Sequence, residues 1–109
     1  MRESDIVSAI RLAVGRDPDV VIWRNSGGVA TAASGNVQRF GLCVGAADLI
    51  GICRGRFLAL EVKTGSGRVT VEQEMFLLLV RRKGGFAAVV RSVAEAAEAI
   101  GRCKAGGVE

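Results

Sequence analysis

The 109-residue chain contains no histidine and no tyrosine, and these two absences exclude several kinds of chemistry. A serine or cysteine triad needs an imidazole base, and a zinc hydrolase usually needs histidine ligands. A chain without tyrosine cannot form a phosphotyrosyl intermediate with DNA. Any catalysis must therefore rest on aspartate, glutamate, lysine, serine or cysteine.

Cysteines and long apolar runs are also scarce. Cys43, Cys53 and Cys103 are odd in number and show no C-x-x-C spacing, so the pattern favours buried free thiols over a zinc knuckle or a disulfide framework. The longest apolar run, residues 75–80, is far shorter than the about 20 residues that span a bilayer. We expect a soluble, cytoplasmic protein.

The positive charge of the chain is concentrated in its middle. The net charge is +4, and residues 20–71 carry six basic and two acidic residues, so that 6 − 2 = +4 already accounts for the excess. The basic residues are mostly arginine, whose planar guanidinium suits phosphate oxygens. This segment therefore predicts a phosphate-binding surface, although any single arginine of it can also be merely solvated.

The two acids of this basic segment, Asp48 and Glu61, stand inside apolar, strand-like runs. A buried carboxylate is costly unless it is ion-paired, hydrogen-bonded or bound to a metal. A metal site is one interpretation of the two acids. A structural ion pair with a neighbouring arginine is the alternative.

Apolar periodicity and capping residues predict a single α/β domain over residues 1–109, with a mixed sheet flanked by helices in the order α–β–(β)–β–β–α–β–α. Residues 25–36 are small and uncharged and read as a long loop. The last helix is expected to open at Ser92-x-x-Glu95 and to run along Ala94, Ala97 and Ile100. The predicted elements are helices at 3–14, 70–83 and from 92 onward, and strands at 19–24, 37–40, 47–53, 57–63 and 86–90.

The strands at 47–53 and 57–63 have the spacing of a β-hairpin. If its turn consists of Arg54 and Gly55 alone, Asp48 falls opposite Glu61, whereas a three-residue turn shifts the pairing by one position. Opposed residues have Cβ atoms roughly 4.5–5.5 Å apart, so two such carboxylates can share a divalent cation. Lys63 follows Glu61 by two residues and points to the same face. The three side chains are expected to converge.

Two further polar residues each have two interpretations. Glu3 continues the apolar face of the first helix and can point toward the core, but an acid in a solvated first turn is also favoured by the helix dipole. Gln73 follows Thr70 by three residues, the spacing of a capping box, in which the glutamine has no chemical role.

Three segments of the chain resemble the PD-(D/E)xK nuclease signature as VRR-NUC domains, the virus-type replication–repair nucleases, carry it. They are Gly45-Ala-Ala-Asp48-Leu-Ile-Gly51, Phe57-Leu-Ala-Leu-Glu61-Val-Lys63-Thr-Gly-Ser-Gly67-Arg, and Gln73. The chain departs from the family at Ala47, where the motif has a proline that ligates nothing. The resemblance implies a restriction-endonuclease-like core and a Mg²⁺ or Mn²⁺ ion held by Asp48, Glu61 and the Val62 backbone carbonyl, with Glu3 as a further candidate ligand. It also implies that Lys63 and Gln73 act at the scissile phosphate.

The resemblance implies a metal-dependent endodeoxyribonuclease of a bacterial or phage-infected host cell. The chain has no recognisable element for reading base sequence, so we expect structure-selective rather than sequence-specific cleavage. The resemblance implies that the substrate is branched DNA such as a four-way junction. We expect a homodimer, because so small a domain reaches only one scissile phosphate. Two rivals remain, a non-catalytic DNA-binding module and a structural or assembly subunit. The residues expected to contact DNA are Arg24, Asn25, Arg39, Arg54, Arg56 and Arg68.

Overall fold

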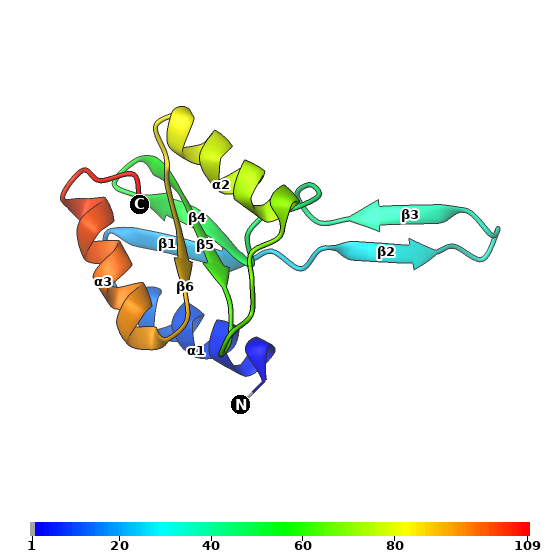
Figure 1. Ribbon diagram of the computed structural model, residues 1–109, viewed down its shortest axis with the longest axis horizontal. Coiled ribbons are helices and arrows are strands. Elements are labelled where there is room, and N and C mark those ends of the chain that lie inside the picture. Colours follow the sequence, from blue (N-terminus) through cyan, green and yellow to red (C-terminus); the bar gives the residue numbers. More distant parts are fainter. Residues whose placement is uncertain (1) are drawn as a thin grey trace.

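The computed structural model describes residues 2–109, and the side chains of residues 28–30 and 40 are outside this description. Over these described residues the chain forms three helices and six strands, which Figure 1 labels in chain order. Their bounds are α1 Glu3–Val14, β1 Val20–Arg24, β2 Gly28–Thr31, β3 Val37–Phe40, β4 Leu49–Cys53, β5 Arg56–Val62, α2 Val71–Arg82, β6 Phe86–Val90 and α3 Val93–Lys104.

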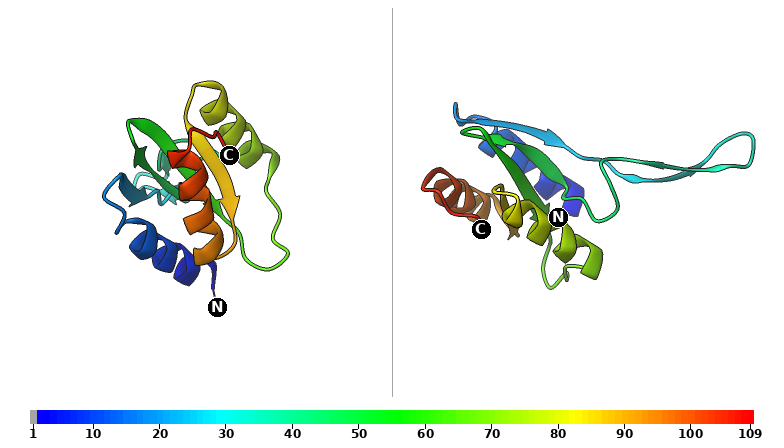
Figure 2. Two further views of the ribbon diagram at one scale, coloured as in Figure 1. Left: turned by 90° about the vertical axis from the view of Figure 1, so that its left-hand side faces the viewer. Right: turned by 90° about the horizontal axis from the view of Figure 1, so that it is seen from above.

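Four of the strands form a mixed sheet in the order β1-β4-β5-β6. The β1–β4 and β4–β5 pairs are antiparallel and the β5–β6 pair is parallel, with α2 as the crossover between the parallel strands. Helices α1 and α3 cover one face of this sheet and α2 covers the other (Figures 1 and 2). The expected α/β architecture with a mixed sheet flanked by helices is confirmed.

The hydrophobic core lies on both faces of the sheet. On the α1 and α3 side it includes Ile10, Leu60 and Phe86, and on the α2 side it includes Ala59 and Leu77. Strand β5 is central and is buried on both faces from Leu58 to Val62. Glu61 lies within this buried stretch, so its side chain is withdrawn from water.

The helices begin where the capping residues predict. The Thr70 hydroxyl accepts a hydrogen bond from the Gln73 amide, and the Gln73 side chain accepts one from the Thr70 amide, so the capping box is formed. Ser92 accepts from the Glu95 amide at the start of α3. These bonds satisfy amides that the first turn of a helix leaves without an intrahelical partner.

The β4–β5 hairpin has the register expected from a two-residue turn. Arg54 and Gly55 both have positive φ angles, 50° and 80°, which is the geometry of a type I′ turn. Cys53 then pairs with Arg56 and Leu49 with Leu60. Continuing this register by one residue places Asp48, just before β4, opposite Glu61.

Three expectations are corrected. The predicted loop at 25–36 contains strand β2, which pairs with β3 to form a separate two-stranded sheet. Helix α3 buries Ala96, Ala99, Ile100 and Cys103, while Ala94 and Ala97 are exposed. Alanine occurs on both sides of this helix, so its apolar pattern does not define one face. Cys53 and Cys103 are buried free thiols as expected, but Cys43 is exposed.

Strands β2 and β3 project from the body of the molecule as an arm (Figures 1 and 2). We use "the arm" for residues 28–40. Among the residues that the structure describes, no helix is long and apolar enough to cross a membrane.

Candidate active site

Glu61 is the buried acid of the protein's sheet. It lies on β5 beneath α2, and only 2% of its surface is exposed. Its Oε1 atom has no hydrogen-bond partner among the residues that the structure describes. Its Oε2 atom lies 3.6 Å from the Lys63 ammonium nitrogen, too far for a strong hydrogen bond. The carboxyl group is thus deeply buried and only partly compensated.

Asp48 lies at the same end of the sheet and faces Glu61 across the hairpin. One oxygen of its carboxylate, Oδ2, accepts a hydrogen bond of 2.9 Å from the Val62 amide. The Asn25 amide donates to the Asp48 carbonyl at 2.8 Å, which ties β1 to the residue just before β4. Asp48 is held from both neighbouring strands, and its half-buried side chain lines a cleft.

The protonation of Glu61 reflects this surrounding. Burial is the main cause that raises the pKa of Glu61 from its ordinary 4.5 to about 8, and the neighbouring Asp48 carboxyl group contributes to this increase. Lys63 opposes the shift, and the charge of Glu3 adds a smaller increase. Without a cation, the Glu61 carboxyl group therefore keeps its proton near neutral pH.

The Val62 backbone carbonyl is directed toward the same site. The Lys63 amide donates to the Val90 carbonyl on the β6 side of β5, whereas the Val62 amide donates to Asp48 on the β4 side. The N–H and C=O of one residue in a strand point to the same side. The carbonyl oxygen of Val62 thus faces the side occupied by Asp48.

Lys63 and Gln73 approach the site from different elements. The Lys63 side chain is only 12% exposed and shares the sheet face of Glu61, as their spacing predicts. Gln73, at the start of α2, lines the cleft together with Asp48. Because its Oε1 atom accepts from Thr70, its Nε2 amide group is what it can offer to the cleft. Gln73 thus has both a capping role and a place beside the acids.

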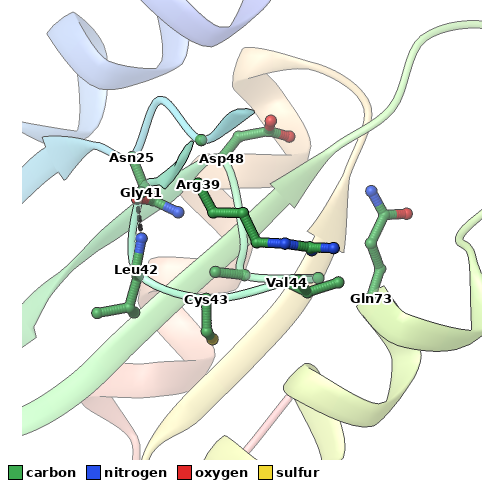
Figure 3. Close-up of a pocket in the computed structure, with 11 residues that line it drawn as sticks. Asn25, Arg39, Gly41, Leu42, Cys43, Val44, Asp48 and Gln73 are labelled. Atoms are coloured by element: carbon green, nitrogen blue, oxygen red, sulfur yellow. Dashed lines mark hydrogen bonds between the residues drawn. The ribbon is translucent and has the colours of Figure 1, made fainter. Parts of the chain in front are cut away.

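The cleft has a volume of about 620 Å³ and lies between the base of the arm, the loop before β4 and the start of α2. Figure 3 shows Arg39 extending across it from β3, with Asp48 and Gln73 on either side. Gly45, in the loop before β4, has a φ of 81°, and a Cβ atom there would lie 2.4 Å from the Glu72 carbonyl oxygen. A residue without a side chain lets this loop pack against the first turn of α2, which forms another wall of the cleft.

Glu3 lies near the site without joining it. It is the first residue of α1 and is exposed, and its charge is the smallest of the influences on Glu61. Among residues 2–109, no group of three or more His, Cys, Asp or Glu side chains is close enough to hold a metal. The acids that come together are therefore the two of the hairpin.

The predicted DNA-contacting residues divide into two groups. Asn25 and Arg39 line the cleft. Arg24 is the last residue of β1, and the next residue, Asn25, donates to the Asp48 carbonyl. The exposed Arg68 lies in the segment between β5 and α2. All four lie at the end of the sheet that holds the two acids.

Arg54 and Arg56 lie at the other end of the hairpin. Arg54 pairs with Asp19 at 3.0 Å and donates to the Lys104 carbonyl, and Arg56 donates to the carbonyls of Cys103 and Gly107. At about 3.3 Å per residue, five residues of β4 separate this end from Asp48 by about 17 Å. These two arginines hold the end of α3, and the fold does not bring them to the cleft.

Sequence reasoning gave no role to Arg91, which contacts the segment after Lys63. Its guanidinium donates to the Gly65 carbonyl at 3.0 Å and so fixes the segment that follows Lys63. Parallel strands end at the same edge of a sheet, so the residue after β6 lies beside the residue after β5. Pairing the two parallel strands in the sequence would have identified Arg91.

A comparison of the chain with models of known families finds no match, and a comparison with curated proteins finds none either.

Proposed function

We propose that the protein is a Mg²⁺- or Mn²⁺-dependent endodeoxyribonuclease with a restriction-endonuclease-like core of the VRR-NUC kind. The observation that carries the proposal is the buried Glu61 carboxyl, whose Oε1 atom has no partner among the described residues and which faces a second acid, Asp48. A buried acid that faces a second acid costs stability and is not explained by packing. It is explained if the pair binds a divalent cation.

The donor set fits Mg²⁺ or Mn²⁺. These ions take oxygen ligands, keep several waters and need only one or two carboxylates from the protein. Asp48 and Glu61 would supply the carboxylates, and the Val62 carbonyl would supply a neutral oxygen. When bound there, the ion would polarise a DNA phosphate and lower the pKa of the attacking water.

The other residues of the cleft have roles that suit hydrolysis of a phosphodiester. Lys63 is withdrawn from water, and electrostatic interactions of its positive charge are stronger there than in water. It would stabilise the negative charge that develops at phosphorus. Arg39 would bind a neighbouring phosphate, and the Nε2 group of Gln73 would orient the nucleophile or the phosphate. Water adds to phosphorus, one P–O ester bond breaks, and the leaving oxygen takes up a proton.

The preferred substrate is proposed to be branched DNA. An open cleft at the end of a small sheet can reach one scissile phosphate, and a four-way junction has two that are related by symmetry. We therefore include a homodimer in the proposal. Val21 and Trp23 on the edge strand β1 are 53% and 52% exposed, and the register places Val21 beside Ile52, which is also exposed, in β4. An apolar row at an uncovered sheet edge suits a contact with a second copy.

The test compares cleavage of a four-way junction and of a linear duplex with Mg²⁺, Mn²⁺ or a chelator. Glu61→Gln and Lys63→Ala should each lower the cleavage rate at least about a hundredfold. Glu98→Gln, a change at an exposed glutamate of α3, is the matched control and should cleave normally. Unchanged cleavage in both site variants would overturn the proposal.

The same preparations distinguish the rivals. A DNA-binding module would show salt-sensitive binding without metal-dependent cleavage, and an assembly subunit would not bind DNA. In either rival protein, the Glu61–Lys63 ion pair would have a structural role alone.

Light scattering measures the oligomeric state, and Trp23→Glu should convert a dimer into a monomer. A monomeric native chain would contradict the proposed dimer.

A further inference from the structure

The arm has no packing role that the fold explains. Its strands pair only with each other, and Figures 1 and 2 show it extending away from the four-stranded sheet. Its described side chains from Ala33 to Arg39 are exposed, including Val37 at 66%. A two-stranded ribbon is at best marginally stable by itself in water. Such a segment is expected to have a ligand.

The base of the arm is attached to the candidate active site. The Asn25 side chain, just before β2, donates to the Ala47 carbonyl and accepts from the Leu42 amide. It therefore links the segment before β2 and the segment after β3 to the loop before β4 (Figure 3). The Asn25 amide is bonded to the Asp48 carbonyl. The direction of the arm is therefore fixed relative to Asp48, and a molecule that contacts the arm is positioned over the cleft.

The tip of the arm is a regular tight turn. The Gly35 amide donates to the Ala32 carbonyl, and the Ala32 amide donates to the Asn36 carbonyl. The β2–β3 register then pairs Thr31 with Val37 and the Ala30 backbone with Gln38. Successive side chains of a strand point to opposite faces, so Asn36 and Gln38 lie on one face of the ribbon, and Val37 and Arg39 lie on the other.

The charge of the arm suits a polyanion. No acid occurs between Asp19 and Asp48, and within the arm Arg39 is the one charged residue of the sequence. The exposed polar side chains are otherwise neutral, and they can donate or accept hydrogen bonds at nucleic-acid edges. Of the arm's side chains that the structure describes, Val37 is the one large exposed apolar group.

We infer that the arm lies in a groove of duplex DNA beside the scissile phosphate. Adjacent strands are about 4.8 Å apart, and a two-stranded ribbon of this width enters a major groove about 12 Å wide. The four residues of β2, 28–31, extend about 13 Å, and the turn beyond them carries the arm further along the groove, away from the cleft. The inference rests on the proposed nuclease function, and it adds that binding of a duplex segment depends on uncharged contacts outside the cleft.

The first test shortens the arm. Residues 30–38 are replaced by a two-residue Asn-Gly turn, which closes on the Val29–Arg39 pair and retains Arg39. Binding is measured in the Glu61→Gln background, so that cleavage does not interfere. The shortened arm should weaken duplex binding at least about tenfold. Because it loses no charge, the slope of log K against log salt should stay the same.

Arg39→Ala gives the opposite signature. Loss of one phosphate contact should lower that slope by about 0.9, and Arg16→Ala, which removes an exposed arginine at the other end of the sheet, should leave it unchanged. Ser34→Glu keeps the arm intact and brings a negative charge to its tip, so it should weaken binding, while Ser8→Glu on the exposed side of α1 should not.

The outcomes separate the two proposals. Normal DNA affinity of both the shortened arm and Ser34→Glu would overturn the inference, even if the native chain cleaves DNA. A change in oligomeric state with unchanged DNA affinity would also overturn it, and would assign the arm to a second copy. Loss of affinity through the arm in a chain that does not cleave would overturn the nuclease proposal and would retain only the docking of the arm on duplex DNA.

Discussion

Replacement of Glu61 by glutamine should change how the stability of the metal-free protein depends on pH. Burial, together with the neighbouring Asp48, raises the pKa of Glu61 from 4.5 to about 8, so the folded protein binds one proton more than the unfolded chain between these values. Stability attributable to Glu61 is fully present below pH 4.5 and is lost as the pH rises through about 8. Glutamine has the same shape and does not titrate, so Glu61→Gln should be free of this loss.

The size of the effect follows from the shift. A difference of 3.5 pKa units corresponds to about 5 kcal/mol, since each unit is worth about 1.4 kcal/mol, and relaxation around the carboxylate makes this an upper bound. For a chain of about 100 residues, 1 kcal/mol changes Tm by at least about 4 °C. The Tm of Glu61→Gln minus that of the native chain should therefore rise by about 10–20 °C between pH 4.5 and pH 9.

The assay is thermal unfolding in a chelator at several pH values, with Glu98→Gln as the control. The exposed Glu98 should show a Tm difference that does not vary with pH. Mg²⁺ at pH 8 should raise the Tm of the native chain, because it binds the folded state, and should have little effect on the Tm of Glu61→Gln. Parallel Tm profiles of the native chain and Glu61→Gln from pH 4.5 to pH 9 would refute the reasoning.

Three further predictions concern residues around the site. A thiol reagent at neutral pH should modify only the exposed Cys43 until the protein is unfolded, because Cys53 and Cys103 are buried. Burial also raises the pKa of the Cys103 thiol to about 11. Rapid modification of all three cysteines in the folded protein would contradict this packing. Gly45→Ala should cost about 1–3 kcal/mol in urea unfolding and slow cleavage, since its Cβ would strike the first turn of α2. Arg56→Ala should cost about 1–3 kcal/mol while leaving DNA affinity unchanged, and a loss of affinity would show that it contacts DNA.

The elements fixed by local rules were predictable from the sequence. The turn residues Arg54 and Gly55 determine the hairpin register, and that register brings Asp48 to Glu61. Thr70 and Ser92 define helix starts because their hydroxyls can accept from amides of the first turn. In each case a short stretch of chain contains all the groups that form the interaction.

Features set by contacts between distant segments were less predictable. Strand β2 has small residues and little alternation, and its pairing with β3 is visible only once the turn at Ala32–Gly35 is recognised. Arg54 is six residues from Asp48 in the sequence but lies at the opposite end of the sheet, because the hairpin runs the length of the strands. Proximity along the chain was a poor guide to proximity in the fold.

The cation proposed to join Asp48 and Glu61 can be located by anomalous diffraction from crystals soaked in Mn²⁺. We predict one peak within coordination distance of the Asp48 and Glu61 carboxylates and the Val62 carbonyl, and no peak there in crystals of Glu61→Gln. If Mn²⁺ leaves this position empty in crystals of the native chain whose cleft is open to solvent, the two acids do not form a metal site and the proposed mechanism is wrong.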